Sequence, residues 1–122
     1  GDRAAVHLLD AFERHLSPGD RPVLTHCQIL NDSLVRRMAA AGVVANVQPQ
    51  FVPSDLPIVR GRLGEGSERF RFAYAWETLL DRGVRLAGGS DSPVEAPAPL
   101  AGMADAMEHV LHEGERLGFG ES

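Results

Sequence analysis

Apolar positions recur along the chain with two different periods, and this pattern predicts alternating helices and strands. Residues 2–16 place apolar side chains every three or four positions, which is typical of an amphipathic helix. The stretches 23–27, 43–48 and 84–88 are short and almost wholly apolar, which is typical of strands in a parallel sheet. Because these strands alternate with helices, we expect an α/β fold with three adjacent parallel strands and helices packed on one side.

Capping and chain-breaking residues predict the remaining elements. Further helices are expected over about 31–42, 67–83 and 100–112. The segment 50–66 contains prolines and glycines throughout and is interpreted as an irregular connection. Connections of this length are often functional, so we expect this segment to be mobile and to cover a site.

Composition narrows the function classes. The chain has 122 residues and a formal net charge of −5, which argues against nucleic-acid binding because that function requires a basic surface. No apolar run approaches the length needed to span a membrane, and no signal peptide opens the chain, so a cytoplasmic protein is expected. All 12 basic residues are arginine, so the sequence offers no lysine for Schiff-base or carbamate chemistry. The single cysteine excludes an internal disulfide.

Polar side chains follow each of the three predicted strands. They occur in Thr25–Gln28, in Asn46–Gln48 and in Ser90–Ser92. Because parallel strands end at the same edge of a sheet, and because active sites of such folds lie at that edge, we expect these side chains to share one rim. The adjacent Gly88 and Gly89 are expected to let the backbone approach another group closely.

His26 and Asp91 are the candidate metal ligands on that rim. Imidazole nitrogen and carboxylate oxygen both suit a divalent ion, and an aspartate beside such an ion can accept a proton from water. The alternative is that His26 is a half-buried histidine at a strand end and that Asp91 only caps a turn or the last helix.

Other chemistry-bearing residues are interpreted as structural. The spacing of His109 and His112 permits chelation, but a solvated helix face is the favoured interpretation, and His7 and His15 are expected at the surface. Cys27 is expected to be a small buried hydrophobe rather than a nucleophile, because adjacent strand residues point to opposite faces. A group of aromatic residues is interpreted as helix packing: Phe70, Phe72, Tyr74 and Trp76.

An ordered set of short motifs carries a family resemblance. In chain order these are "GDRA", "LLDAFE", "THCQIL", "GVVANVQPQF", "SDLP", "RLGE", "FAYAWETLLDRGV" and "GGSDSPVE", and the match covers about residues 1–107. In this order they resemble the amidohydrolase superfamily. Within it they resemble amidohydrolase family 3, and in particular the branch that contains N-substituted formamide deformylase. The resemblance implies a metal-dependent (β/α)8 TIM barrel whose enzymes cleave amide-like C–N bonds of small molecules with an activated water.

The resemblance also implies roles for individual residues. His26 matches the family's strand 6 histidine, a metal ligand, and Asp91 matches its strand 8 aspartate, which contacts the metal site and transfers a proton. Gln48 is expected near the substrate. The implied cofactor is a divalent metal, with Zn²⁺ expected first and Mn²⁺ or Fe²⁺ also suited.

The chain departs from the family pattern in two ways. Thr25 stands where the family usually has glutamate, and Gly1 falls just after the family's strand 5 histidine. We therefore expect residues 1–122 to form a partial barrel arc, from helix 5 to helix 8, with about three parallel strands and four helices. Two function classes stay open: an inactive segment of a metal-dependent amidohydrolase, or a non-catalytic α/β module that self-associates through exposed sheet edges or pairs with another chain.

Overall fold

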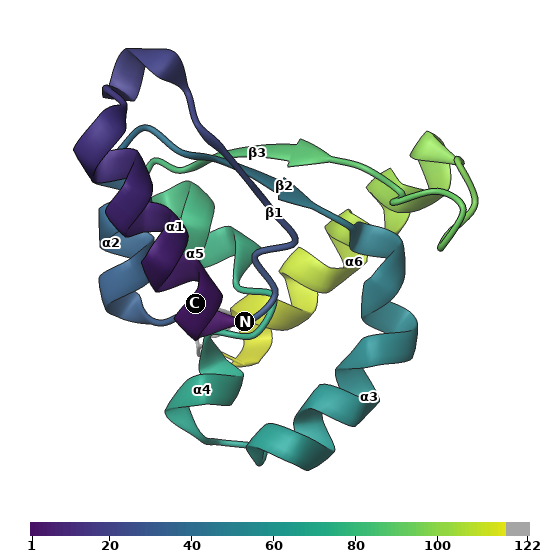
Figure 1. The fold of residues 1–122 in the computed structure, drawn as a ribbon. Helices are drawn as coiled ribbons and strands as arrows, with labels where there is room; N and C mark the ends of the chain where they lie inside the picture. The colour runs from purple at the N-terminus through teal and green to yellow at the C-terminus, as the bar shows by residue number, and fades with distance from the viewer. Residues whose placement is uncertain (117–122) are drawn as a thin grey trace.

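The fold is a three-stranded parallel sheet covered by helices. The computed structural model describes the backbone of residues 1–116 and the side chains of residues 1–109. The elements in chain order are α1 (Asp2–His15), η1 (Pro18–Asp20), β1 (Val23–Thr25), α2 (Asp32–Ala40), β2 (Val44–Val47), η2 (Pro49–Phe51), α3 (Val52–Leu63), α4 (Glu68–Arg71), α5 (Trp76–Asp81), β3 (Arg85–Gly88) and α6 (Pro99–Arg116). Figure 1 shows the course of the chain through these elements.

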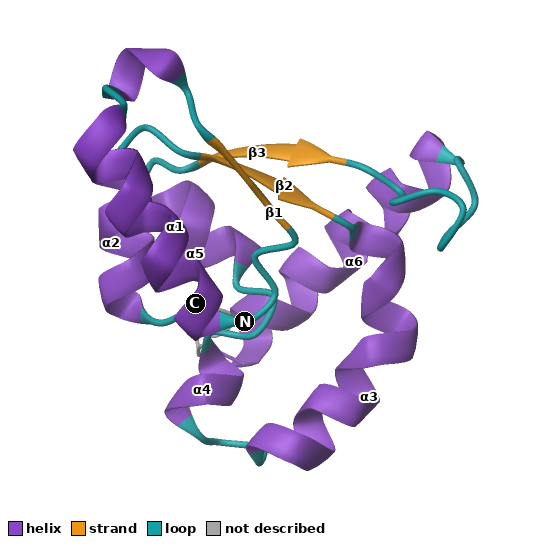
Figure 2. Ribbon diagram, in the orientation of Figure 1, coloured by secondary structure: helices purple, strands orange, loops and turns teal. Residues whose placement is uncertain are grey.

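The sheet has the order β1-β2-β3, and both strand pairs are parallel, which confirms the predicted topology. Leu24 pairs with Ala45, and Ala45 pairs with Leu86, so these three side chains share the face that the helices cover. The opposite face is open: Val23 is 55% exposed there, and no described helix crosses it (Figure 2). The helices therefore lie on one side, as the sequence predicts.

The core lies between the sheet and the helices. Its largest fully buried side chains come from α1, α2, α5 and the connecting segments, and they include Leu9, Leu34, Met38, Trp76 and Leu79. Arg37 links α2 to α1 through ion pairs with Asp10 at 2.6 Å and with Glu13 at 2.8 Å. The hydrogen bond from Arg37 lowers the pKa of Glu13.

The structure corrects the expectation that residues 50–66 are irregular, because η2 and α3 occupy most of that segment. Pro53 lies in the first turn of α3, where its missing N–H removes no intrahelical hydrogen bond. Only Val52 is buried in α3, so the helix shows almost no apolar periodicity by which it could be recognised. Gly64, with φ of 80°, ends it.

The predicted helix over 67–83 is interrupted between α4 and α5. Ala73 forms an antiparallel bridge with Ile29, and Tyr74 has a left-handed φ of 51°. A tertiary backbone contact thus overrides the helical pattern of the sequence. The four buried aromatic residues do pack in the core, but they come from two short helices and the turn between them.

Core packing of α2 can be tested by truncating Leu34, which is 1% exposed. Leu34→Ala should lower the free energy of unfolding by about 2–5 kcal/mol, because it removes buried methyl groups and leaves a cavity. Leu100→Ala, at a position that is 79% exposed, is the matched control and should change it by less than about 0.5 kcal/mol. Equal effects of the two changes in urea unfolding would contradict the described core.

Candidate active site

The parallel register brings His26 and Asp91 together at the carboxyl ends of β1 and β3. His26 Nε2 lies 3.9 Å from Asp91 Oδ2, and the two side chains are 45% and 46% exposed. The His26 backbone N–H donates to Asn46 O at 2.8 Å, and the Gly89 N–H donates to Val47 O at 3.0 Å, so the strand ladders continue to the rim. His26 is thus bonded to the sheet through its own backbone, Asp91 follows two residues after the last ladder bond, and both side chains are accessible.

The backbone at both residues is left-handed. His26 has φ of 73°, Cys27 has φ of 52° and Asp91 has φ of 55°. β1 therefore ends at Thr25 rather than at Cys27 as the sequence predicts. The Asp91 turn is closed by its own carbonyl, which accepts from Val94 N–H at 2.9 Å. The expected role of the Asp91 carboxylate as acceptor for that turn is not found among the described residues.

The pair suits two ligands of one metal ion. Two ligand atoms about 2.0–2.2 Å from a tetrahedral zinc lie about 3.4 Å from each other, which a small side-chain rotation of this pair would reach. Nitrogen and oxygen donors of this kind accept Zn²⁺, Mn²⁺ or Fe²⁺. Within residues 1–109, however, no group of three or more His, Cys, Asp or Glu side chains is arranged to hold a metal.

Gln48 also lies at this edge, but its side chain is only 4% exposed. Its Nε2 donates to Asn46 O at 3.3 Å, and its Oε1 has no hydrogen-bond partner among the described residues. A Cβ at Gly89 would lie 4.0 Å from Gln48 Nε2 and 3.5 Å from Asn46 Oδ1, an ordinary contact distance. At Gly88 a Cβ would meet nothing within 4 Å, so no close contact with a described residue requires glycine at either position.

Two features near His26 are not predicted by the sequence. The Phe51 ring lies 6.1 Å from the His26 ring, centroid to centroid, and forms an apolar wall beside it. Asp55 accepts hydrogen bonds from Tyr74 at 3.0 Å and from Gln28 at 3.4 Å. Phe51 and Asp55 both lie in the segment that was expected to be irregular. There the family motif "SDLP", which contains Asp55, was the only sequence feature that indicated a role.

The predicted exposure of the remaining histidines is confirmed for two of them and wrong for a third. His7 and His15 are exposed, as predicted. His109 is not on a solvated helix face: it is 3% exposed, its Nε2 lies 2.6 Å from Tyr74 O, and its ring packs on Trp76. The sequence interpretation failed because α6 turns this side chain toward the loop that interrupts the predicted helix. The His112 side chain lies outside the described residues.

A family model described as "Amidohydrolase family" matches residues 1–122. The chain belongs to the amidohydrolase family. It is 39% identical over its whole length to "Putative amidohydrolase YtcJ" of Bacillus subtilis and 32% identical over 98% of its length to "Protein LONG AFTER FAR-RED 3" of Arabidopsis thaliana. It spans 23% and 22% of those two proteins, less than a quarter of each.

Solved structures of two metal-dependent hydrolases share the fold of this amidohydrolase chain. An uncharacterized one from Pyrococcus furiosus matches with a TM-score of 0.71 and 31% identity over 86% of the chain. Another from Pyrococcus horikoshii matches with a TM-score of 0.75 and 28% identity over 95% of the chain. The chain covers 21% and 23% of these structures. The three strands and their helices are an arc of a (β/α)8 barrel, as the sequence predicts.

The described helices include none that is long and apolar enough to cross a membrane.

Cys27 provides a test of the turn after β1. Its thiol is 5% exposed and donates to Leu24 O at 3.2 Å, and burial raises its pKa to about 12. At pH 8 only about one such thiol in ten thousand is ionised. Iodoacetamide should therefore modify the native protein at least about a hundredfold more slowly than the protein in denaturant. Equal rates, measured by mass spectrometry, would show that this turn is open.

Proposed function

We propose that this chain supplies His26 and Asp91 to the metal centre of an amidohydrolase that cleaves amide-like C–N bonds of small, non-peptide molecules with water. The observation that carries the proposal is the 3.9 Å separation of His26 Nε2 and Asp91 Oδ2 at the carboxyl end of the sheet. Membership of the amidohydrolase family supports the reaction class. The family model matches residues 1–122, so this support does not depend on His26 and Asp91 alone.

Each residue has a distinct part in this proposal. A divalent ion, when bound, polarises the substrate carbonyl and lowers the pKa of a water to about 7. His26 binds that ion through Nε2. The Asp91 carboxylate accepts a proton from the attacking water and delivers it to the departing nitrogen as the C–N bond breaks. General acid–base help of this kind contributes a factor of about 10²–10⁴ in rate.

Gln48 and Phe51 are proposed to shape the substrate side of the site. The Oε1 of Gln48, which has no hydrogen-bond partner within residues 1–109, is available to a substrate N–H after a small displacement of its side chain. The Phe51 ring beside His26 presents an apolar surface. A small amide such as an N-substituted formamide fits this combination, which follows the resemblance to that branch of the family.

The 122-residue chain alone is proposed to bind metal weakly and to hydrolyse nothing. A catalytic zinc commonly has three protein ligands besides its water, and residues 1–109 bring together two. The relatives in which the complete activity would reside are more than four times longer than the part this chain matches.

Calorimetric titration with Zn²⁺ and Mn²⁺, together with an amide-hydrolysis assay, tests this proposal. The wild-type chain should bind with a dissociation constant in the millimolar range, which corresponds to about 4 kcal/mol of binding free energy. His26→Ala and Asp91→Asn should each abolish that weak binding, whereas His15→Ala, at an exposed position on α1, should preserve it. Tight binding or turnover by the chain alone, lost in either site variant, would show that the site is complete.

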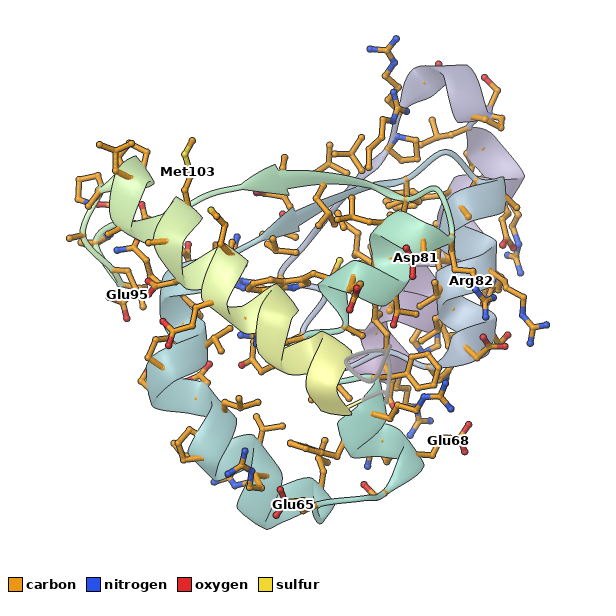
Figure 3. The ribbon with its side chains drawn as sticks, turned by 180° about the vertical axis from the view of Figure 1, so that it is seen from behind. Glu65, Glu68, Asp81, Arg82, Glu95 and Met103 are labelled. Carbon is orange, nitrogen blue, oxygen red and sulfur yellow. The ribbon has the colours of Figure 1, made fainter. Side chains whose placement is uncertain are left out.

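A self-associating, non-catalytic module is the second candidate function. It is favoured by the open sheet face and by an apolar groove of about 780 Å³ beside the β3 edge, between that edge and α6. Met103 projects from α6 at this groove (Figure 3), and it is 61% exposed, while Met107 is 70% exposed. Unpaired strand edges and exposed apolar surface both promote association of chains.

Light scattering across a range of protein concentrations tests the second candidate. The wild-type chain should increase in apparent mass with concentration, and Met107→Glu should shift the association to at least about tenfold higher concentration, because it places a charge in the groove. Glu65→Gln, at an exposed position remote from the groove (Figure 3), is the control. A monomer at every concentration would contradict self-association.

A further inference from the structure

The turn that carries His26 has an unfavourable backbone conformation. His26 and Cys27 are consecutive left-handed residues, with φ of 73° and 52°, and neither is glycine. L residues adopt this region in succession only when the surrounding structure imposes it. The position of the His26 imidazole therefore depends on the groups that hold the turn on both sides.

On its β1 side the turn is held by the sheet, and on its far side by the segment between α4 and α5. The Tyr74 N–H donates to Gln28 O at 2.8 Å, and the Leu30 N–H donates to Phe72 O at 3.2 Å. These two bonds flank the bridge between Ile29 and Ala73. Tyr74 is itself left-handed, so this second segment also needs a constraint of its own.

Asp55 supplies a constraint common to both segments. One oxygen of its carboxylate, Oδ2, accepts from the Tyr74 hydroxyl at 3.0 Å and from Gln28 Nε2 at 3.4 Å. Burial and the Asp55 carboxylate raise the pKa of Tyr74, so the phenol stays protonated and remains a donor. Hydrogen bonds to a charged acceptor are stronger than those between neutral groups. Asp55 thus ties α3 to both sides of the bridge.

We propose that Asp55 is a positioning residue: its carboxylate, through Gln28 and Tyr74, holds the His26–Cys27 turn so that the imidazole lies beside Asp91. That this placement of His26 serves metal binding rests on the proposed function. The mechanical link, which is the pair of hydrogen bonds from Gln28 and Tyr74 to Asp55, does not. Gln28 and Tyr74 are the two residues through which the carboxylate acts, and Asp55 needs no contact with substrate or metal.

Amide hydrogen exchange of the 122-residue chain measures the mechanical link. Asp55→Ala should speed exchange of the Leu30 and Tyr74 amides at least about tenfold, because the bridge opens more often without its shared acceptor. Exchange of the Val35 amide, which bonds to Asn31 O in α2, should stay as in the wild type. Asp55→Asn retains an acceptor oxygen and should restore part of the protection.

Three further variants control for a general loss of stability. Tyr74→Phe and Gln28→Ala each remove one hydrogen-bond donor to Asp55. Each should increase the exchange rate of the Leu30 and Tyr74 amides, but less than Asp55→Ala does. These two variants replace Asp55→Ala in the test if that variant does not fold. Asp81→Ala, an exposed aspartate on α5 (Figure 3), should leave every amide unchanged. A uniform increase across Leu30, Tyr74 and Val35, or no increase in any variant, would overturn the positioning role.

A zinc titration followed by NMR separates this inference from the proposed function. At millimolar Zn²⁺ the His26 ring resonances of the wild type should shift, and Asp55→Ala should need at least about fivefold more zinc for the same shift. If zinc leaves His26 unperturbed in the wild type, the proposed function fails while the exchange data still decide the role of Asp55. If His26 responds equally in both proteins, the inference fails and the proposed function stands.

Discussion

The parallel register of β1, β2 and β3 is the constraint on which the candidate site depends. Because Thr25 pairs with Asn46 and Asn46 pairs with Ala87, all three strands end at the same level. Residues that follow distant strands in the sequence, His26 and Asp91, therefore meet at 3.9 Å. A shift of β1 or β3 by one residue would turn that strand's buried side chains to the open face and separate the pair.

That register is maintained from one side only. Leu24 and Ala45 pack against the helices, while Val23 and Thr25 face outward on a surface that no described element covers. In a closed (β/α)8 barrel the corresponding face is filled by side chains from all the strands. The amidohydrolase arc thus holds its rim through the helix-facing core, and its open face corresponds to the interior of a closed barrel.

The sequence was sufficient to predict the three-stranded sheet and the edge at which His26 and Asp91 meet. Both follow from short apolar runs that end in polar residues, a pattern that is visible within a few neighbouring positions. It was insufficient wherever a tertiary contact sets the backbone. Ala73 leaves the helical path to pair with Ile29, His26 and Cys27 turn left-handed after a shortened strand, and α3 forms despite Pro57 without an apolar stripe. For the same reason the link from Asp55 to Tyr74 and the burial of His109 could not be foreseen.

The most direct test of the account is anomalous diffraction at the zinc edge from crystals of this protein soaked in millimolar zinc. We expect an anomalous peak between the two side chains, about 2.0–2.2 Å from His26 Nε2 and from an Asp91 carboxylate oxygen. The peak should vanish in crystals of His26→Ala. Zinc bound only at other residues, with His26 and Asp91 still 3.9 Å apart and unliganded, would contradict it.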